Sequence, residues 1–168
     1  ERYALFIMQV HDDSNLIHYG EGWTNEAAIM YVQQQVSRGM QLVVKEHPSD
    51  YGRIEYQKPA GVDWRRTTPT ADLIAGADAV WTINSSVAVE AMRQKKKVHV
   101  LGRAAFADIA NRYSGVNQEV VDRYLYWLRW HYLIKTNPFA LNDEGNVQAA
   151  QRILDIAAGK TPWMDCFV

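Results

Sequence analysis

The sequence contains a single cysteine, Cys166, and almost no excess charge, because 18 Lys and Arg residues face 19 Asp and Glu residues for a net charge of −1. One cysteine excludes an internal disulfide and a zinc site built from several cysteines. Proteins that bind nucleic acid chiefly through its phosphates usually carry a basic excess, so we expect no nucleic-acid partner. No apolar run approaches the roughly 18–20 residues that cross a bilayer, so the chain does not read as transmembrane.

Glycine-rich phosphate-binding motifs are also missing. Neither G-x-G-x-x-G nor G-x-x-x-x-G-K-[ST] occurs, which argues against a dinucleotide site and against a P-loop nucleoside triphosphatase. Without an Asp-x-Asp pair or a cluster of histidines, we expect neither a bound metal nor a cofactor. The composition that remains, 48% hydrophobic and 22% charged residues, is typical of a folded globular domain.

The beginning of the chain points to a longer protein. Glu1 is not a methionine, no signal peptide precedes the first apolar segment, and that segment, Ala4–Val10, begins almost at once. We therefore interpret the sequence as an excised segment. Because it contains no internal repeat, low-complexity tract or linker, residues 1–168 are expected to form one domain.

Apolar runs of strand length alternate with helix-like segments. Strands are predicted at residues 4–10, 41–46, 79–83 and 97–101. Helices are predicted at residues 25–38, 70–76, 84–94, 117–134 and 145–158. Thr24 is the predicted N-cap of the first helix, Gly39 ends it, and Pro48 ends the second strand. The alternation predicts an α/β fold, a Rossmann-like parallel sheet with helices on both faces.

Most of the reactive side chains lie in three loops that follow predicted strands, after Val10, Glu46 and Ile83. Ligands of such sheets bind outside the carboxyl ends of the strands. The first loop holds Asp12 and Asp13 next to His11. These groups could do acid–base work, attack a carbon centre or bind a metal. Alternatively, one of the aspartates caps backbone N–H groups at a turn.

The second loop contains His47 followed by Pro48. Proline biases the preceding residue toward extended backbone, which would hold the imidazole at the carboxyl edge of the sheet. There the imidazole could donate to a phosphate, and a surface histidine is the alternative.

The third loop, Asn84-Ser85-Ser86, offers hydroxyls and backbone N–H groups together at a predicted helix start. This arrangement can bind an anion or simply cap the helix. Glu90 lies one turn further and could reach a ribose hydroxyl or face solvent. Arg103 follows the fourth predicted strand and could pair with a phosphate or carboxylate, or lie on the surface.

The segment Tyr124 to Tyr132 carries aromatic residues on several faces of a predicted helix. They cannot all enter one core, so some are expected to contact another domain or subunit. A base-stacking platform is the alternative, and the near-neutral charge argues against it.

Taken in order, these motifs resemble the capsule polysaccharide biosynthesis family, whose members include bacterial β-Kdo glycosyltransferases. The matching stretches are Gln9-x-x-x-Asp13-Ser14, Lys45-x-His47-Pro48, Ser85-Ser86-x-x-x-Glu90-Ala91 and Leu101-Gly102-Arg103-Ala104 with Phe106. The resemblance covers residues 5–109. It implies one half of a GT-B enzyme, in which the active site lies between two Rossmann-like domains, and therefore a missing N-terminal domain.

The resemblance also implies roles for individual residues. The residues that would bind a CMP-sugar donor are His47, Pro48, Ser85, Ser86, Glu90, Lys45 and Arg103. Among them, His47 would contact the phosphate and count as a catalytic residue, and Ser85 and Ser86 would contact the phosphate or cytidine. Asp13 would be the nucleophile of a retaining transferase, and Gln9 would support it or position the sugar.

The donor implied by the resemblance is CMP-Kdo or a related CMP-sugar, and the acceptor is a saccharide or glycolipid of capsule or lipopolysaccharide assembly. The implied location is cytoplasmic, at the inner face of the bacterial inner membrane, with peripheral membrane association through the rest of the protein. An inverting sialyltransferase-like enzyme with Asp13 as general base is one alternative. Another is a non-catalytic nucleotide- or sugar-binding module of capsule export. A lone GT-B half could be inactive by itself.

Overall fold

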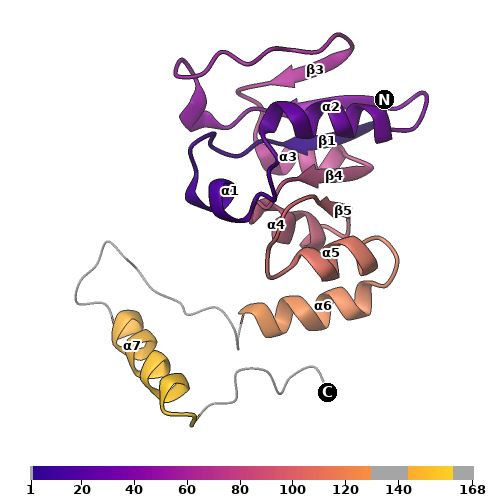
Figure 1. Ribbon diagram of the computed structural model, residues 1–168. Helices are drawn as coiled ribbons and strands as arrows, with labels where there is room; N and C mark the ends of the chain where they lie inside the picture. The colour runs from indigo at the N-terminus through magenta and orange to yellow at the C-terminus, as the bar shows by residue number, and fades with distance from the viewer. Residues whose placement is uncertain (1, 130–143, 161–168) are drawn as a thin grey trace. The chain divides into compact units, whose positions relative to one another are not determined.

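The computed structural model describes residues 2–129 and 144–160, and Figure 1 shows its helices and strands. The chain divides into two compact units, 1–122 and 123–168. The first unit contains a five-stranded sheet in the order β3-β2-β1-β4-β5, with parallel pairing between neighbouring strands. The predicted Rossmann-like α/β sheet is thereby confirmed, and the expectation of a single domain stays a prediction.

The strands are short, and the central ones are apolar. They are β1 (Tyr3–Ile7), β2 (Gln41–Lys45), β3 (Val62–Arg65), β4 (Ala79–Thr82) and β5 (Lys97–Val100). The sequence pattern does not predict β3, because Asp63 and Arg65 interrupt its apolar residues. A short, charged strand suits the edge of a sheet, where it discourages pairing with another chain.

Helices cover both faces of the sheet, as the alternation predicts. Those of the first unit are α1 (Ser14–Tyr19), α2 (Asn25–Gln35), the 3₁₀ helix η1 (Pro48–Asp50), α3 (Thr70–Gly76), α4 (Val87–Arg93) and α5 (Ala107–Tyr113). On one face, Phe6 packs in a buried cluster with Ile29 of α2. Tyr3 lies on the opposite face, since successive strand residues alternate, and its hydroxyl donates to the carbonyl of Leu73 in α3 at 2.6 Å.

Helix α2 begins where the sequence indicates and ends earlier than predicted. The Thr24 side chain caps it by accepting the Ala27 N–H at 3.2 Å. The helix ends at Gln35, before the predicted Arg38. Gly39 instead lies in the turn that leads into β2, where its φ of 86° favours glycine.

Strand β1 ends at Ile7 rather than at Val10, because the backbone of Gln9 bonds to a side chain instead of extending the ladder. The Gln9 N–H donates to Asn25 Oδ1 at 3.2 Å, and the Gln9 carbonyl accepts from Asn25 Nδ2 at 2.8 Å. The residues after β1 are therefore free to form a loop at the sheet edge.

Helix α5, which the sequence pattern does not predict, covers the outer edge of β5. The amide of Asn111 accepts the Val100 N–H at 2.8 Å and donates to the Val100 carbonyl at 3.0 Å. The Ser114 hydroxyl accepts the Val98 N–H at 2.7 Å. These side chains satisfy backbone groups that a further strand would otherwise pair with, so this edge is closed.

Helices α6 (Gln118–Trp127) and α7 (Glu144–Ala157) follow. The predicted helical residues 130–134 lie outside the described residues, and so does Cys166. Tyr126 is 62% exposed, and the expected contact of the aromatic segment with another domain or subunit stays a prediction. Within residues 2–129 and 144–160, no helix is long and apolar enough to cross a membrane.

Candidate functional site

The predicted loops meet at the carboxyl ends of three adjacent strands, β2, β1 and β4. We call them the histidine loop (residues 46–57), the aspartate loop (residues 8–13) and the serine loop (residues 83–86). The chain progresses from β1 to β3 on one side and from β4 to β5 on the other, so the topological switch point lies between β1 and β4. Ligands of open α/β sheets bind in the crevice at such a point.

Gln9 joins the aspartate loop to the serine loop across the switch point. Its side-chain Oε1 accepts the backbone N–H of Asn84 at 2.9 Å, and Gln9 is only 7% exposed. Asn84 in turn donates through Nδ2 to the carbonyl of Asn15 at 2.9 Å. The sequence-based expectation that Gln9 acts at the site stays a prediction, and the structure assigns it a connecting position between the two loops.

Asp13 is the N-cap of α1, where its Oδ1 accepts the Asn15 N–H at 2.7 Å. Asp13 therefore caps a backbone N–H group, as one of the two sequence-based interpretations predicts. Capping occupies one oxygen, and the side chain remains partly exposed. Asp13 could thus present its second oxygen to a ligand, and its catalytic role stays a prediction.

The neighbouring Asp12 has a different environment. Its Oδ2 lies 2.9 Å from Nη2 of Arg53, a residue of the histidine loop that the sequence does not single out. The hydrogen bond from Arg53 lowers the pKa of Asp12 below its ordinary value. Among the described residues, Asp13 has no ion pair of this kind. The two adjacent carboxylates are thus distinct, and Asp12 is the one engaged by a cation.

His47 has the extended backbone that Pro48 favours, with φ of −74° and ψ of 132°. Its Nδ1 accepts the Ser49 N–H at 3.2 Å and caps η1. In the neutral imidazole this assigns the proton to Nε2, because the accepting nitrogen cannot also carry it. The partly buried His47 therefore has a hydrogen-bond donor, Nε2–H, on the opposite side of its ring from the backbone it caps.

Lys45 is 5% exposed, and its ammonium is surrounded by acceptors. Its Nζ donates to the carbonyl of Glu46 at 3.0 Å, the hydroxyl of Tyr51 at 2.9 Å and the carbonyl of Arg66 at 2.6 Å. An ammonium has three protons, so these contacts use all of them. The predicted contact of Lys45 with a CMP-sugar stays a prediction. The geometry favours a structural role at the ends of β2 and β3.

The paired serines behave differently from one another. Ser85 donates its N–H to Thr82 Oγ1 at 3.3 Å and accepts the Val87 N–H on Oγ at 3.3 Å, so its hydroxyl helps to start α4. Ser86 is exposed and makes no side-chain capping bond. Its hydroxyl is therefore the more accessible of the two for a ligand.

Glu90 and Arg103 each have a partner on the surface. Glu90 accepts from Arg93 at 3.2 Å and from Gln94 at 3.1 Å, both within or next to α4. Arg103 Nε lies 3.5 Å from the Glu21 carboxylate, and its side chain is 72% exposed. Exposed pairs of this kind contribute little to stability, so neither excludes a ligand. Their predicted roles remain untested.

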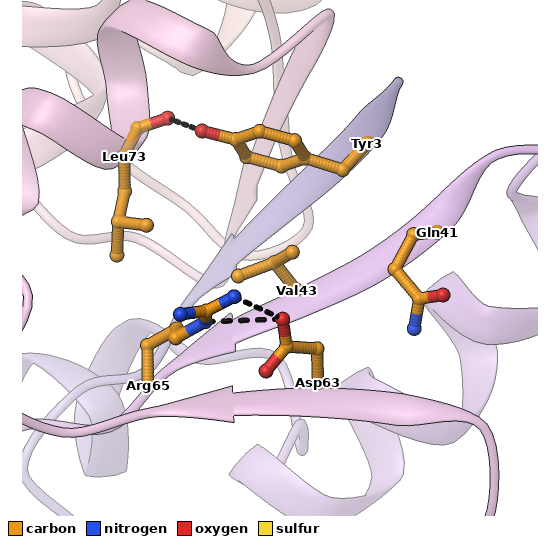
Figure 2. Close-up of a pocket in the computed structure, with 6 residues that line it drawn as sticks. All are labelled: Tyr3, Gln41, Val43, Asp63, Arg65 and Leu73. Carbon is orange, nitrogen blue, oxygen red and sulfur yellow. Dashed lines mark hydrogen bonds and ion pairs between the residues drawn. The ribbon is translucent and has the colours of Figure 1, made fainter. Parts of the chain in front are cut away.

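A separate pocket of about 250 Å³ lies on the face of the sheet that carries Tyr3 (Figure 2). It is lined by Tyr3, Gln41, Val43, Asp63, Arg65 and Leu73. Figure 2 shows the Arg65 guanidinium turned toward the Asp63 carboxylate, at 2.6 Å, so these charges satisfy each other. The pocket contains none of the predicted site residues and lies along the strands rather than beyond their carboxyl ends. We therefore locate the candidate site at the loops.

Sequence reasoning misses the residues that hold the loops together. Asp50 is fully buried and accepts from the Tyr56 hydroxyl at 2.6 Å, while Asn25 brackets the backbone of the aspartate loop. The position of Asp50 two residues after Pro48 of the His-Pro motif is a signal that could mark it. Nothing in the local pattern marks Asn25 or Tyr56. In the part of the chain that the structure describes, no group of three or more His, Cys, Asp or Glu residues could hold a metal ion.

Comparison with known proteins gives matches over most of the chain. A family model described as capsule polysaccharide biosynthesis protein matches residues 1–110. The capsule polysaccharide export protein KpsS of Escherichia coli is 29% identical over 132 residues, which cover 68% of this chain and 33% of KpsS. The chain thus spans about a third of the length of this curated relative.

Two solved structures of Thermosulfurimonas dismutans KpsC share the fold. The match to its beta Kdo 2,7 transferase has a TM-score of 0.53 and 20% identity, covering 72% of this chain and 43% of that one. The match to its beta Kdo 2,4 transferase has a TM-score of 0.51 and 17% identity, covering 71% and 43%. The family model spans the whole sheet and all three loops, and we conclude that this chain belongs to the capsule polysaccharide biosynthesis protein family.

Proposed function

We propose that this chain is the donor-binding half of a GT-B glycosyltransferase that acts in bacterial capsule assembly. The observation that carries the proposal is the convergence of three polar loops at the switch point of the sheet, two of them joined by the bond between Gln9 and Asn84. Family membership and the fold shared with two Kdo transferases support it. The proposed donor is a CMP-activated 2-keto sugar acid, with CMP-Kdo the first to test.

The phosphate of the sugar donor would be held by hydrogen-bonding groups of the protein rather than by a metal. His47 offers Nε2–H, because its Nδ1 is occupied by the Ser49 N–H. Ser86 offers an exposed hydroxyl from the serine loop. Hydrogen bonds from fixed donors to the departing CMP would stabilise the negative charge that develops as it leaves.

Asp13 would act as the nucleophile. One of its oxygens would attack the anomeric carbon while the bond from that carbon to the CMP oxygen breaks, and CMP would leave with the electron pair. An acceptor hydroxyl would then attack the same carbon and lose its proton to a base or to solvent, while the bond from that carbon to the Asp13 oxygen breaks and releases the free carboxylate. Two displacements at one carbon give net retention of configuration. The Asn15 N–H, which holds the other oxygen at 2.7 Å, would keep the carboxylate in place.

The decisive experiment measures transfer from CMP-Kdo by the full-length protein and by its Asp13→Asn variant. Loss of the nucleophile should lower transfer by about a thousandfold or more. Asp12→Asn is the matched control, because it removes the adjacent carboxylate that is paired with Arg53. Near-normal transfer by Asp13→Asn would reject the nucleophile assignment. Formation of product with inverted configuration would favour the sialyltransferase-like alternative, in which Asp13 is a general base.

A second candidate function is a non-catalytic nucleotide- or sugar-binding module of capsule export. The observation that favours it is the match to a relative named as a capsule polysaccharide export protein. Binding of CMP or CMP-Kdo by the full-length protein without any turnover would support this candidate.

The proposed transferase additionally requires a saccharide or glycolipid acceptor, a second Rossmann-like domain and a position at the inner face of the inner membrane.

A further inference from the structure

A buried network of hydrogen bonds underlies the candidate site and begins at Asp50. The Asp50 side chain is fully buried at the end of η1. Its Oδ2 accepts two hydrogen bonds, from the Tyr56 hydroxyl at 2.6 Å and from the backbone N–H of His11 at 3.2 Å. The second bond connects the histidine loop directly to the aspartate loop.

The network continues through the first residue of α2. Asn25 Nδ2 lies 3.4 Å from the Tyr56 hydroxyl, and the same amide brackets the backbone of Gln9. Gln9 then accepts the Asn84 N–H in the serine loop. A single chain of buried contacts therefore passes from the histidine loop to the aspartate loop and on to the serine loop.

Stability alone does not explain why a carboxylate, that of Asp50, stands at the start of this hydrogen-bond network. Among the described residues, the two groups that donate to the Asp50 carboxylate are both uncharged. Its Oδ1 is buried without a hydrogen-bond partner. Burying a carboxylate without a cation is costly, and a neutral side chain of the same shape avoids that cost. A charged acceptor does form shorter and stronger hydrogen bonds than a neutral one, which favours a fixed loop geometry.

The Tyr56 hydroxyl is well suited to donate to this carboxylate. Burial, together with the hydrogen bond to Asp50, raises the pKa of Tyr56 well above its ordinary value. The phenol therefore keeps its proton at any physiological pH and remains a donor to Asp50.

We propose that Asp50 is a positioning residue, whose buried carboxylate fixes the histidine loop against the aspartate loop so that His47 and Asp13 face the same donor molecule. Its effect on catalysis rests on the proposed transferase function. Asp50 itself touches no substrate. It acts through the His11 N–H and through Tyr56, and the catalytic cost of its loss comes from misplaced loops.

Asp50→Asn in the full-length protein is the sharpest test. The amide keeps an acceptor oxygen for Tyr56 and His11 and places an NH₂ group where Oδ1 lacks a partner. We expect an unchanged or higher melting temperature together with a fall of about tenfold in kcat for transfer from CMP-Kdo, and little change in KM. Asp78→Asn, in an exposed pair with Arg2 at the amino end of β4, is the matched control and should leave kcat unchanged. A structural role alone would lower stability and activity in parallel, and that result would overturn the proposal.

Tyr56→Phe provides a second variant that keeps the carboxylate. It should lower kcat less than Asp50→Asn, and the double variant should be no worse than Asp50→Asn alone, since both act on one network. Tyr3→Phe, which loses a hydroxyl bond on the strand face, is its control. Additive losses in the double variant would contradict a shared network.

Amide hydrogen exchange separates this proposal from the proposed function. In Asp50→Asn, peptides that cover residues 8–15 and 83–86 should exchange at least several times faster than in the wild type, while peptides of β4 and β5 should not change. Unchanged exchange in both loops would overturn the positioning role whether or not the protein transfers Kdo. If the loops loosen and the wild-type protein shows no transfer, the proposed function fails and the positioning role stands.

Discussion

The carboxyl edge of the sheet and the pocket on the face that carries Tyr3 use the same kinds of side chain for different purposes. Each region contains an aspartate, a tyrosine and a glutamine: Asp50, Tyr56 and Gln9 at the carboxyl edge, and Asp63, Tyr3 and Gln41 at the pocket. At the pocket, one hydrogen bond joins β1 to α3, one joins β2 to the residue just before β3, and one lies within β3, so they tie elements that the sheet already positions. At the carboxyl edge, they connect loops that no strand pairing holds.

This difference predicts which property a substitution changes in each region. A bond between elements already fixed by a parallel ladder adds a local increment of stability. A bond between loops sets the distance between groups that a ligand must meet together, so its loss changes binding or catalysis as well. Substitutions of matched chemistry at the two regions can test this distinction.

Among the effects expected from this comparison, the largest is on nucleotide binding. His47→Ala should weaken CMP binding to the full-length protein by roughly 10- to 100-fold, because a hydrogen bond to a charged group contributes about 1.5–3 kcal/mol. Arg65→Ala removes a cation from the pocket of Figure 2 and should change the CMP dissociation constant by less than about twofold. Isothermal titration calorimetry with CMP measures both.

The opposite result would relocate the nucleotide site. If Arg65→Ala weakened CMP binding and His47→Ala did not, the pocket rather than the loops would hold the phosphate. His18→Ala serves as a control for loss of an imidazole, since His18 is an exposed residue of α1.

An intermediate effect is expected on stability when a glutamine is replaced in each region. Gln9→Leu leaves the buried Asn84 N–H without its acceptor, which costs about 1–3 kcal/mol of unfolding free energy. Gln41→Leu removes an exposed bond to the Gly61 carbonyl and should cost less than about 0.5 kcal/mol. Urea denaturation of the two variants provides the comparison. Equal losses would show that the two glutamines have the same structural importance.

Local sequence signals predicted those features whose causes lie within a few residues. Pro48 favours the extended backbone of His47, Thr24 caps α2, and apolar runs mark β1, β2, β4 and β5. Lys45 shows where local signals fail. Its motif predicts a contact with the CMP-sugar, whereas the fold surrounds its ammonium with hydrogen-bond acceptors from two loops. Asp50 shows it again, since its partner His11 lies 39 residues away. Hydrogen bonds across such separations depend on the assembled sheet and leave no local pattern.

The smallest expected effect concerns the exposed ion pair of the aspartate loop. Arg53 lowers the pKa of Asp12 below its ordinary value, so this pair stabilises the folded state at neutral pH. The contribution is fully present above the ordinary carboxyl pKa of about 4 and disappears as the pH falls through the lower, folded value. Between about pH 4 and pH 2, the melting temperature of Asp12→Asn should therefore fall slightly less than that of the wild type.

Thermal unfolding followed by circular dichroism over this pH range measures the effect, with Arg53→Ala as the reciprocal variant. Both should flatten the acid limb by the same small amount, since each removes one partner of the same pair. A steeper acid limb in Asp12→Asn would mean that the carboxylate opposes folding at neutral pH. At this level the two regions should not differ, because the pair of Asp63 with Arg65 at the pocket is also partly exposed and is screened in the same way. The contrast between the regions therefore depends on the buried bonds between loops, and exposed charges at either edge should not produce it.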